Sequence, residues 1–230
     1  GWDIYGNSEW LKSFEQEVAA DMGLEAALFV PTGVCAQLMA LCVHAELPIS
    51  RASTGPATSF MVHPTSHLLL HEEDAAKQLL GLTPLRVGRS DRPLQAADLE
   101  KDLKRLAAVG CSPSCIFVEV PHRELGCEAT PFEELLKMRA LADMYSVPLH
   151  MDGARLLEVL PFFGRPAEEL TSLFDSVYLS FYKGLGAMTG AMLLGRHDFI
   201  KRAKPWRRRL GGNPYTVMPY TVSCFRAYAQ

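Results

Sequence analysis

The chain has 230 residues, of which 48% are hydrophobic and 21% charged, and a formal net charge of −3 at pH 7. This composition is typical of a globular protein with one sizeable core, and it excludes a disordered or fibrous chain. The small net charge argues against nucleic acid or an anionic membrane as a partner, and no apolar run reaches the roughly 18 residues of a membrane helix.

The cysteines and the chain ends bear on cellular context. The six cysteines form no C-x-x-C pair and stand mostly in apolar segments, which indicates reduced thiols. With no basic and then apolar segment at the N-terminus, we expect a cytoplasmic protein. The chain begins at Gly1 rather than Met and ends at Gln230 without a charged tail. We therefore expect a piece of a longer protein.

Hydrophobic periodicity predicts helices and strands that alternate along the chain. Helical spacing of apolar residues predicts helices over 8–22, 34–44, 72–80, 94–109 and 130–145, with a further helical stretch between 151 and 176. Short apolar runs predict strands at 26–30, 68–70, 85–87, 115–120, 147–151, 176–180 and 191–194. A proline-bounded loop is expected at 48–56.

One helix start carries its own signals. Thr130 can cap the helix, Pro131 suits its first turn, and Glu133 completes a capping box. Alternating strands and helices predict an α/β fold with a mostly parallel sheet between helices. Ligands of such folds bind at the carboxyl ends of the strands, where the loops gather.

Lys183 follows the predicted strand 176–180 directly, in the segment SFYKGLGA. Most lysines are solvated surface residues, but these neighbours are apolar or glycine. Small residues let other groups approach closely. An amine in such a place can attack a carbonyl and form an imine.

Two further segments end predicted strands. Asp152 closes one of them, and its carboxylate is able either to cap the next helix or to pair with a pyridinium nitrogen; the segment alone leaves both roles open. Thr32, Gly33 and Val34 open a helix after a strand, and the free amides there can bind a phosphate. Many such turns exist only for packing.

Three motifs are rejected as sites. His67 and His71 would share one face of a helix and could hold a metal, but the three leucines between them favour a strand, and a third ligand is missing. We predict no metal site there, and a buried or stacking histidine instead. The glycines at 184, 186 and 190 precede a strand rather than the helix of a dinucleotide loop. The basic cluster over 201–209 is interpreted as a solvated helix face or subunit contact.

Taken together, several motifs resemble the low-specificity threonine aldolases of the β-eliminating lyase family. The motifs, in matching order and spacing, are PTG at 31–33, SH at 66–67, ExxH at 119–122, HxDGAR at 150–155 and KGLGA at 183–187. The resemblance runs from residue 3 to about residue 212. It implies the large domain of fold-type I, aspartate-aminotransferase-like pyridoxal-phosphate enzymes, so residues 1–230 are expected to lack the small C-terminal domain of that fold.

The resemblance also implies roles for single residues. Lys183 would carry pyridoxal 5'-phosphate as a Schiff base, Asp152 would meet the pyridine nitrogen, and Arg155 would lie near the phenolic oxygen and the substrate carboxylate. The phosphate would be held by Thr32, Gly33 and Val34. His67 matches the histidine that stacks on the ring and His122 the one near the substrate hydroxyl, and either is a candidate base.

The implied reaction is cleavage of a β-hydroxy amino acid such as threonine or allo-threonine to glycine and an aldehyde. Family sites lie between subunits, which implies a homodimer or homotetramer. Departures from the family pattern at Val34, Tyr182 and 211–215 favour a subfamily with another amino acid substrate. Another lyase or racemase of the same fold is the alternative, and a non-catalytic cofactor-binding or interaction domain is the alternative from another class.

Overall fold

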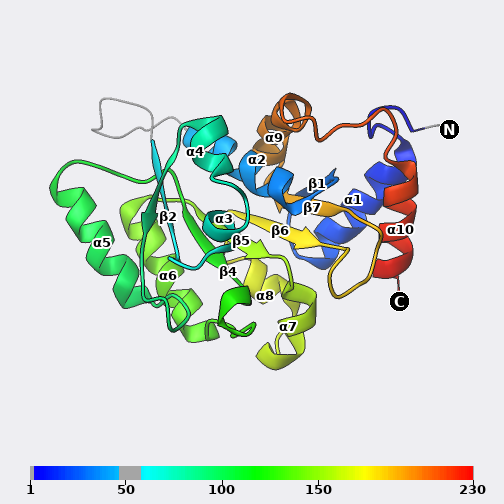
Figure 1. Ribbon diagram of the computed structural model, residues 1–230. Coiled ribbons are helices and arrows are strands. Elements are labelled where there is room, and N and C mark those ends of the chain that lie inside the picture. The colour runs from blue at the N-terminus through cyan, green and yellow to red at the C-terminus, as the bar shows by residue number, and fades with distance from the viewer. Residues whose placement is uncertain (1–2, 47–57, 230) are drawn as a thin grey trace.

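The computed structural model describes residues 3–46 and 58–229, so the loop expected at 48–56 lies outside the described residues. Within these ranges one sheet of seven strands has the order β1-β7-β6-β5-β4-β2-β3. Its strands are β1 (Ala26–Val30), β2 (Ser59–Val62), β3 (Thr83–Arg86), β4 (Ile116–Glu119), β5 (Leu149–Gly153), β6 (Ser176–Ser180) and β7 (Ala191–Gly195). The predicted α/β class is thus confirmed (Figure 1).

Strand direction is mixed at one place. Strands β2, β3, β4, β5 and β6 pair in parallel, whereas β7 is antiparallel to both β6 and β1. The reason is the short connection from β6 to β7 at 181–190, because a parallel pair needs a crossover of about a dozen residues or more, usually helical. The sheet is therefore mostly parallel, with one reversed strand next to the loop that carries Lys183.

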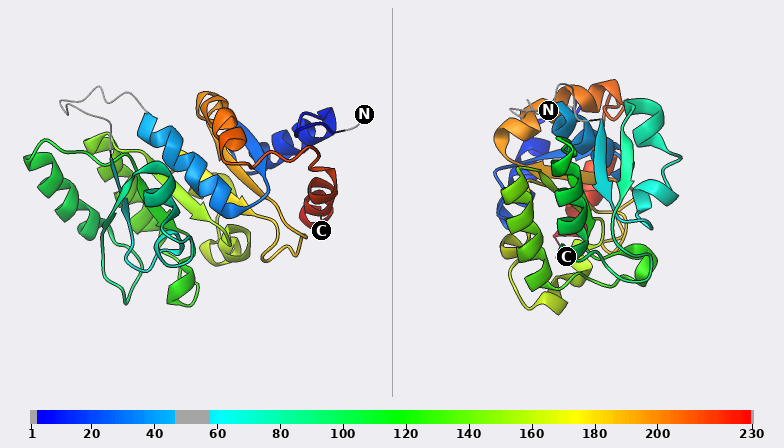
Figure 2. Two further views of the ribbon diagram at one scale, coloured as in Figure 1. Left: turned by 45° about the horizontal axis from the view of Figure 1, so that its top comes forward. Right: turned by 90° about the vertical axis from the view of Figure 1, so that its left-hand side faces the viewer.

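Helices cover both faces of the sheet (Figures 1 and 2). On one face lie α2 (Gly33–Glu46), α3 (His67–Leu70), α4 (Ala75–Leu80) and α9 (His197–Arg209). On the other lie α1 (Glu9–Asp21), α5 (Ala96–Ala108), α6 (Phe132–Tyr145), α7 (Leu156–Phe163), α8 (Ala167–Thr171) and α10 (Met218–Tyr228). Each face has its own apolar cluster, so the domain has three layers.

Strand residues alternate between these two clusters, as the period of two demands. In β4, Ile116 and Val118 face the cluster of α5 and α6, and Phe117 faces that of α2. The same alternation in β5 turns Leu149 and Met151 toward the cluster of α5 and α6. The polar His150 and Asp152, which lie between and after them, are therefore turned toward α2.

Three local predictions need correction. The strand predicted at 68–70 is the short helix α3, because the Ser66 side chain accepts from Leu68 N at 3.2 Å and caps it. The helix predicted from Thr130 begins at Phe132; its N-cap is Pro131, without a side-chain cap, so no capping box forms. The prediction did not include β2, the 3-10 turn Arg123–Leu125 or α10.

Most remaining elements lie near their predicted places, although β3 covers 83–86 rather than 85–87 and α4 begins at Ala75 rather than at residue 72. Strands β1 and β6 have the predicted bounds, and the rejection of a dinucleotide loop before residue 191 is confirmed by β7. All six cysteines are free thiols. Within the described ranges, no helix has the length and apolar character needed to cross a bilayer.

Candidate active site

Lys183 lies in the loop from β6 to β7, at the carboxyl edge of the parallel strands. Its Nζ lies 5.9 Å from the centre of the Tyr178 ring and 5.7 Å from that of Tyr182. The loop is fixed by backbone bonds, from Gly186 N to Lys183 O (3.1 Å) and from Ala187 N to Phe181 O (2.8 Å). Glu158 of α7 also accepts from Gly184 N at 2.8 Å. The Lys183 amine thus lies on a loop held by hydrogen bonds, near the rings of Tyr178 and Tyr182.

The turn at 31–33 leads into the N-terminus of α2, beside the Tyr178 ring. Thr32 Oγ1 accepts from Cys35 N at 3.2 Å, and Thr32 O accepts from Ala36 N at 3.3 Å. The first amides of a helix have no intrahelical acceptor. Those of Gly33 and Val34 therefore stay at the open end of α2, where the helix dipole favours an anion.

Gly33 is required by the fold. A Cβ at this position would lie 2.1 Å from Tyr178 Oη and 2.5 Å from Tyr178 Cζ, and Tyr178 is buried in β6. Thr189 in the Lys183 loop donates to Pro31 O at 2.7 Å. The predicted phosphate turn and the lysine loop are thus joined directly.

Asp152 ends β5 as a buried carboxylate, 6% exposed. Its Oδ1 accepts from Ala154 N at 3.0 Å, and its Oδ2 accepts from Gln37 Nε2 of α2 at 2.5 Å. Burial raises the pKa of Asp152 to about 7; the charge of Glu119 adds to this rise, and that of Lys183 opposes it. The carboxylate and the lysine are therefore close enough to interact electrostatically.

Asp152 does not cap the next helix, which was one of the two roles considered for it. The N-cap of α7 is Arg155, without a side-chain cap, and the bond from Ala154 N to Asp152 Oδ1 is a local turn bond. The second carboxylate oxygen accepts from Gln37.

His67 lies in the first turn of α3, not in a strand. Its backbone N donates to Glu119 Oε1 at 2.6 Å, and its Nδ1 is 3.0 Å from Glu72 Oε1. The hydrogen bond to Glu72 raises the pKa of His67, and the charges of Asp152 and Lys183 also act on it. His67 thus belongs to the same constellation as Asp152 and Lys183.

The predicted absence of a metal at this histidine pair is not contradicted. The rings of His67 and His71 are 5.1 Å apart, but among residues 3–46 and 58–229 no group of three or more ligand side chains could hold a metal ion.

His122 follows β4 and is almost fully buried. Its Nε2 is 3.0 Å from Thr65 Oγ1, and its Nδ1 is 3.7 Å from Glu119 Oε2. Thr65 contacts His63 in turn: Thr65 N and Oγ1 lie 3.2 and 3.0 Å from His63 Nδ1. Burial lowers the pKa of both histidines.

The contacts among His63, Thr65 and His122 determine which nitrogen of His122 carries the hydrogen. His63 Nε2 faces the carbonyls of Arg89 and Arg92, at 2.7 and 3.0 Å, so it carries the hydrogen and Nδ1 is an acceptor. The Thr65 hydroxyl then donates to His63 Nδ1, because otherwise two lone pairs would meet. Thr65 Oγ1 accepts from His122 Nε2–H, which leaves the lone pair of His122 on Nδ1.

Arg155 stands at the N-cap position of α7 and is partly buried. It lines a cavity of about 240 Å³ together with Gly153, Ser180, Gly184 and other residues of the two loops. Arg155 thus borders a cavity lined by residues of both the β5 end and the Lys183 loop.

The basic cluster on α9 is mostly exposed, as a solvated helix face would be, except at Arg207, and the subunit contact stays a prediction. Arg207 is buried and donates to Phe29 O at 3.0 Å. Arg208 and Arg209 lie over the rings of Tyr5 and Trp206, both at 4.4 Å.

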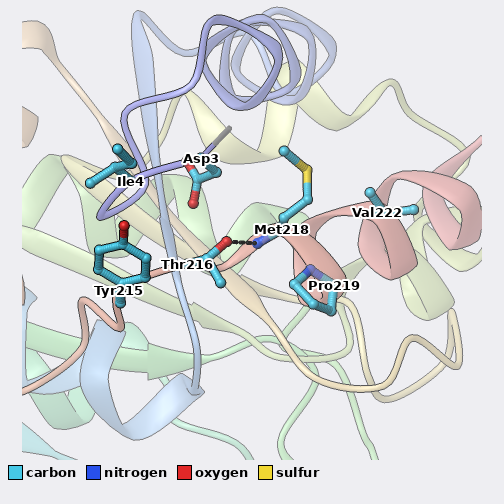
Figure 3. A pocket seen from close by; sticks show the side chains of 7 residues that line it. All are labelled: Asp3, Ile4, Tyr215, Thr216, Met218, Pro219 and Val222. Carbon is cyan, nitrogen blue, oxygen red and sulfur yellow. Dashed lines mark hydrogen bonds between the residues drawn. The ribbon is translucent and has the colours of Figure 1, made fainter. Parts of the chain in front are cut away.

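A larger cavity of about 950 Å³ lies between the N-terminal segment and the start of α10 (Figure 3). Its lining is mainly apolar and includes Ile4, Tyr215 and Met218. The Asp3 carboxylate at its edge already accepts from the amides of Gly6, Ser8 and Val217. None of the site residues above lines this cavity, so the chemistry is not located there.

Two features of the site were not predicted. Gln37 contacts Asp152, and its signal is a polar side chain inside the otherwise apolar run VCAQLMALCV. Helix α10 holds the lysine loop, because Ser223 Oγ accepts from Met188 N (2.9 Å) and Cys224 Sγ donates to Thr189 O (2.9 Å). No local pattern in the sequence announces that second contact.

Comparison with known proteins agrees with this geometry. The model of the β-eliminating lyase family matches residues 1–218. The chain is 30% identical over 213 residues to low-specificity L-threonine aldolase 1 of Arabidopsis thaliana, covering 91% of this chain and 57% of that protein. It is 32% identical over 215 residues to an alanine racemase of Cochliobolus carbonum, covering 92% of this chain and 52% of that protein.

Solved structures give the same result. A candidate L-allo-threonine aldolase from Listeria monocytogenes superposes with a TM-score of 0.90 at 38% identity, over 100% of this chain and 60% of that one. The site and fold define an α/β protein of the fold-type I class. The chain belongs to the β-eliminating lyase family, whose enzymes depend on pyridoxal phosphate. It spans less than two thirds of the length of each of these relatives.

Proposed function

We propose that this chain binds pyridoxal 5'-phosphate, with the Lys183 amine as the point of covalent attachment. The carrying observation is that a buried carboxylate, a lysine and an open helix N-terminus meet at one edge of the sheet. Among the described residues, Asp152 has amide donors but no cationic hydrogen-bond donor, and a protonated ring nitrogen would supply one. The amides of Gly33 and Val34, with Thr32, suit a phosphate.

The remaining site residues are assigned to substrate and ring. Arg155 would bind the substrate carboxylate and lie near the phenolic oxygen, since a guanidinium fork matches a carboxylate. His67 would pack against the cofactor ring, and its hydrogen bonds to Glu119 and Glu72 would hold it there.

We further propose that the reaction is aldol cleavage of a β-hydroxy amino acid to glycine and an aldehyde. When bound, the cofactor supplies an electron sink for the charge left on Cα. The chain must supply a base for the β-hydroxyl proton. His122 suits this role better than His67, because burial lowers the pKa of His122 and its Nδ1 carries a lone pair, whereas the Glu72 bond raises the pKa of His67.

Racemisation is a second candidate, favoured by the 32% identity to an alanine racemase. It would need the same Lys183 and Asp152 and differ in which Cα bond is broken. The role proposed for His122 distinguishes the two reactions, because only aldol cleavage requires a base at the substrate β-hydroxyl.

The test is incubation of the purified chain and cofactor with L-threonine, L-allo-threonine, L-serine and L-alanine. Aldol cleavage predicts glycine and an aldehyde from the first two, with loss of both turnover and the visible absorption band in Lys183→Ala. D-Alanine from L-alanine would support racemisation. Ammonia and a 2-oxo acid without glycine would refute the aldolase assignment. Cofactor binding without turnover would favour the non-catalytic alternative.

A small amino acid is therefore the proposed substrate, in a homodimer or homotetramer located in the cytoplasm. Reduced thiols and the small net charge support the location. Sedimentation of the cofactor-loaded chain would test the oligomer, and a monomer with full turnover would contradict it.

A further inference from the structure

A chain of buried hydrogen bonds runs behind Asp152, between α2 and the sheet. Gln37 Nε2 is 2.5 Å from Asp152 Oδ2, and Gln37 Oε1 is 2.8 Å from His150 Nε2. His150 Nδ1 is 2.7 Å from Ser176 Oγ, which is 2.8 Å from His44 Nε2. All five residues are buried.

The sequence spacing explains why these side chains meet. Gln37 and His44 are seven residues apart, two turns of α2, and therefore share a face. His150 and Asp152 are two apart in β5 and share a face of the sheet, and Ser176 pairs with His150 in register on β6.

The direction of each hydrogen bond in this network follows from Asp152, when its carboxylate is ionised. An ionised carboxylate only accepts, so the Gln37 NH₂ must face Asp152 and its carbonyl must face His150. His150 Nε2 then carries the hydrogen, and its Nδ1 accepts from the Ser176 hydroxyl. Ser176 Oγ accepts from His44 Nε2–H. This leaves His44 Nδ1 as a bare lone pair, and that buried atom has no partner among the described residues.

We propose that Gln37 is a positioning residue for Asp152: His150, Ser176 and His44 lock its amide so that the NH₂ group always faces the carboxylate. The inference deepens the proposed cofactor site, since a pyridinium requires a charged Asp152. Rotating the amide by half a turn would place a carbonyl against the carboxylate and a second N–H against His150 Nε2–H.

The surroundings of Asp152 make such a donor necessary. Burial and the neighbouring charge of Glu119 disfavour the ionised form of Asp152, with a smaller contribution from Glu72. The charge of Lys183 favours it. Gln37 and the Ala154 amide are the hydrogen-bond donors that stabilise the carboxylate directly.

The first experiment uses the unaltered, cofactor-free chain. Nitrogen-15 NMR of histidine reports which ring nitrogen carries the hydrogen. At a pH well above the Asp152 pKa of about 7, where the carboxylate is ionised, we expect His150 and His44 both neutral with the hydrogen on Nε2, in agreement with the lowered pKa of each. A hydrogen on Nδ1 of His150 would overturn the proposal, because Gln37 would then face the wrong way.

The second experiment measures the Asp152 pKa by carbon-13 NMR in variants of the cofactor-free chain. Gln37→Leu should raise it by about 1 to 2 pH units, as expected when one hydrogen bond to a charged group is lost. His150→Phe should raise it too, but add little in the Gln37→Leu background if His150 acts through Gln37. The exposed Gln78→Leu is the matched control and should change nothing.

Two results would overturn the proposal: an unchanged Asp152 pKa in Gln37→Leu, or full additivity in the double variant. Thermal unfolding of each variant identifies any that fail to fold, and the tautomer measurement decides the question without them. Both readouts are independent of cofactor. If they agree with expectation while pyridoxal phosphate does not bind, the proposed function fails and the positioning role stands.

Discussion

Replacing Gly33 by alanine tests the phosphate turn most directly. The new Cβ would lie 2.1 Å from Tyr178 Oη and 3.1 Å from its Cε1. Restoring ordinary contact needs a shift of about 1 Å in α2 or in the ring. Tyr178 is 2% exposed and hydrogen-bonded in mid-sheet through β6, so α2 must move. Overpacking of this kind costs ~1–3 kcal/mol.

Two losses should follow in Gly33→Ala. A chain of this size loses roughly 2–4 °C of Tm per kcal/mol, so a cost of ~1–3 kcal/mol predicts that calorimetry finds a fall of about 2 to 12 °C. Displaced amides of Gly33 and Val34 would weaken phosphate binding, and a fluorescence titration should find the pyridoxal-phosphate Kd raised ~10-fold or more, the loss of about one charge-assisted bond.

The control is Gly23→Ala, which is crowded by Glu168 Cβ at 2.5 Å and has a φ of +63°. It should lower Tm without changing the Kd. Tyr178→Phe in the Gly33→Ala background removes the nearest atom and should restore part of the Tm. Unchanged cofactor affinity in Gly33→Ala would refute the assignment of this turn to the phosphate.

Three further outcomes are expected. Since the folded pKa of Asp152 is raised to about 7, above its ordinary 3.8, its contribution to stability is present below pH ~4 and is lost as pH rises through about 7; the cofactor-free chain should therefore lose Tm over this range relative to Asp152→Asn, and parallel curves would contradict this. In the native chain a thiol reagent should modify only the exposed Cys111 and Cys127, with the four buried thiols reacting after denaturation. Asp175→Ala should cost ~1–3 kcal/mol in urea unfolding, because Leu149 N donates to Asp175 Oδ2 at 2.7 Å and would lose its acceptor.

The order and kind of most elements were predictable, because apolar periodicity is a local property. Strands 26–30 and 176–180 have their predicted bounds. The short segment 68–70 was not predictable from periodicity, since three leucines suit a strand or a helix equally. The Ser66 cap decided it.

The site was partly predictable for the same reason. Lys183 and Asp152 follow apolar strands, and strand ends in parallel sheets gather at one edge. The direction of β7 and the strand order were open, because pairing between distant segments leaves no periodic trace. Neither α10 nor its bonds to the lysine loop could be anticipated.

By itself, the sequence determined the alternation of helices and strands and the family, since each depends on residues close together in the chain. Tertiary structure alone decided that Gln37 meets Asp152, a contact between residues 115 positions apart. It also decided that Tyr178 forbids a side chain at Gly33. Both depend on how α2 lies across the sheet, and that arrangement results from burying two apolar surfaces against each other.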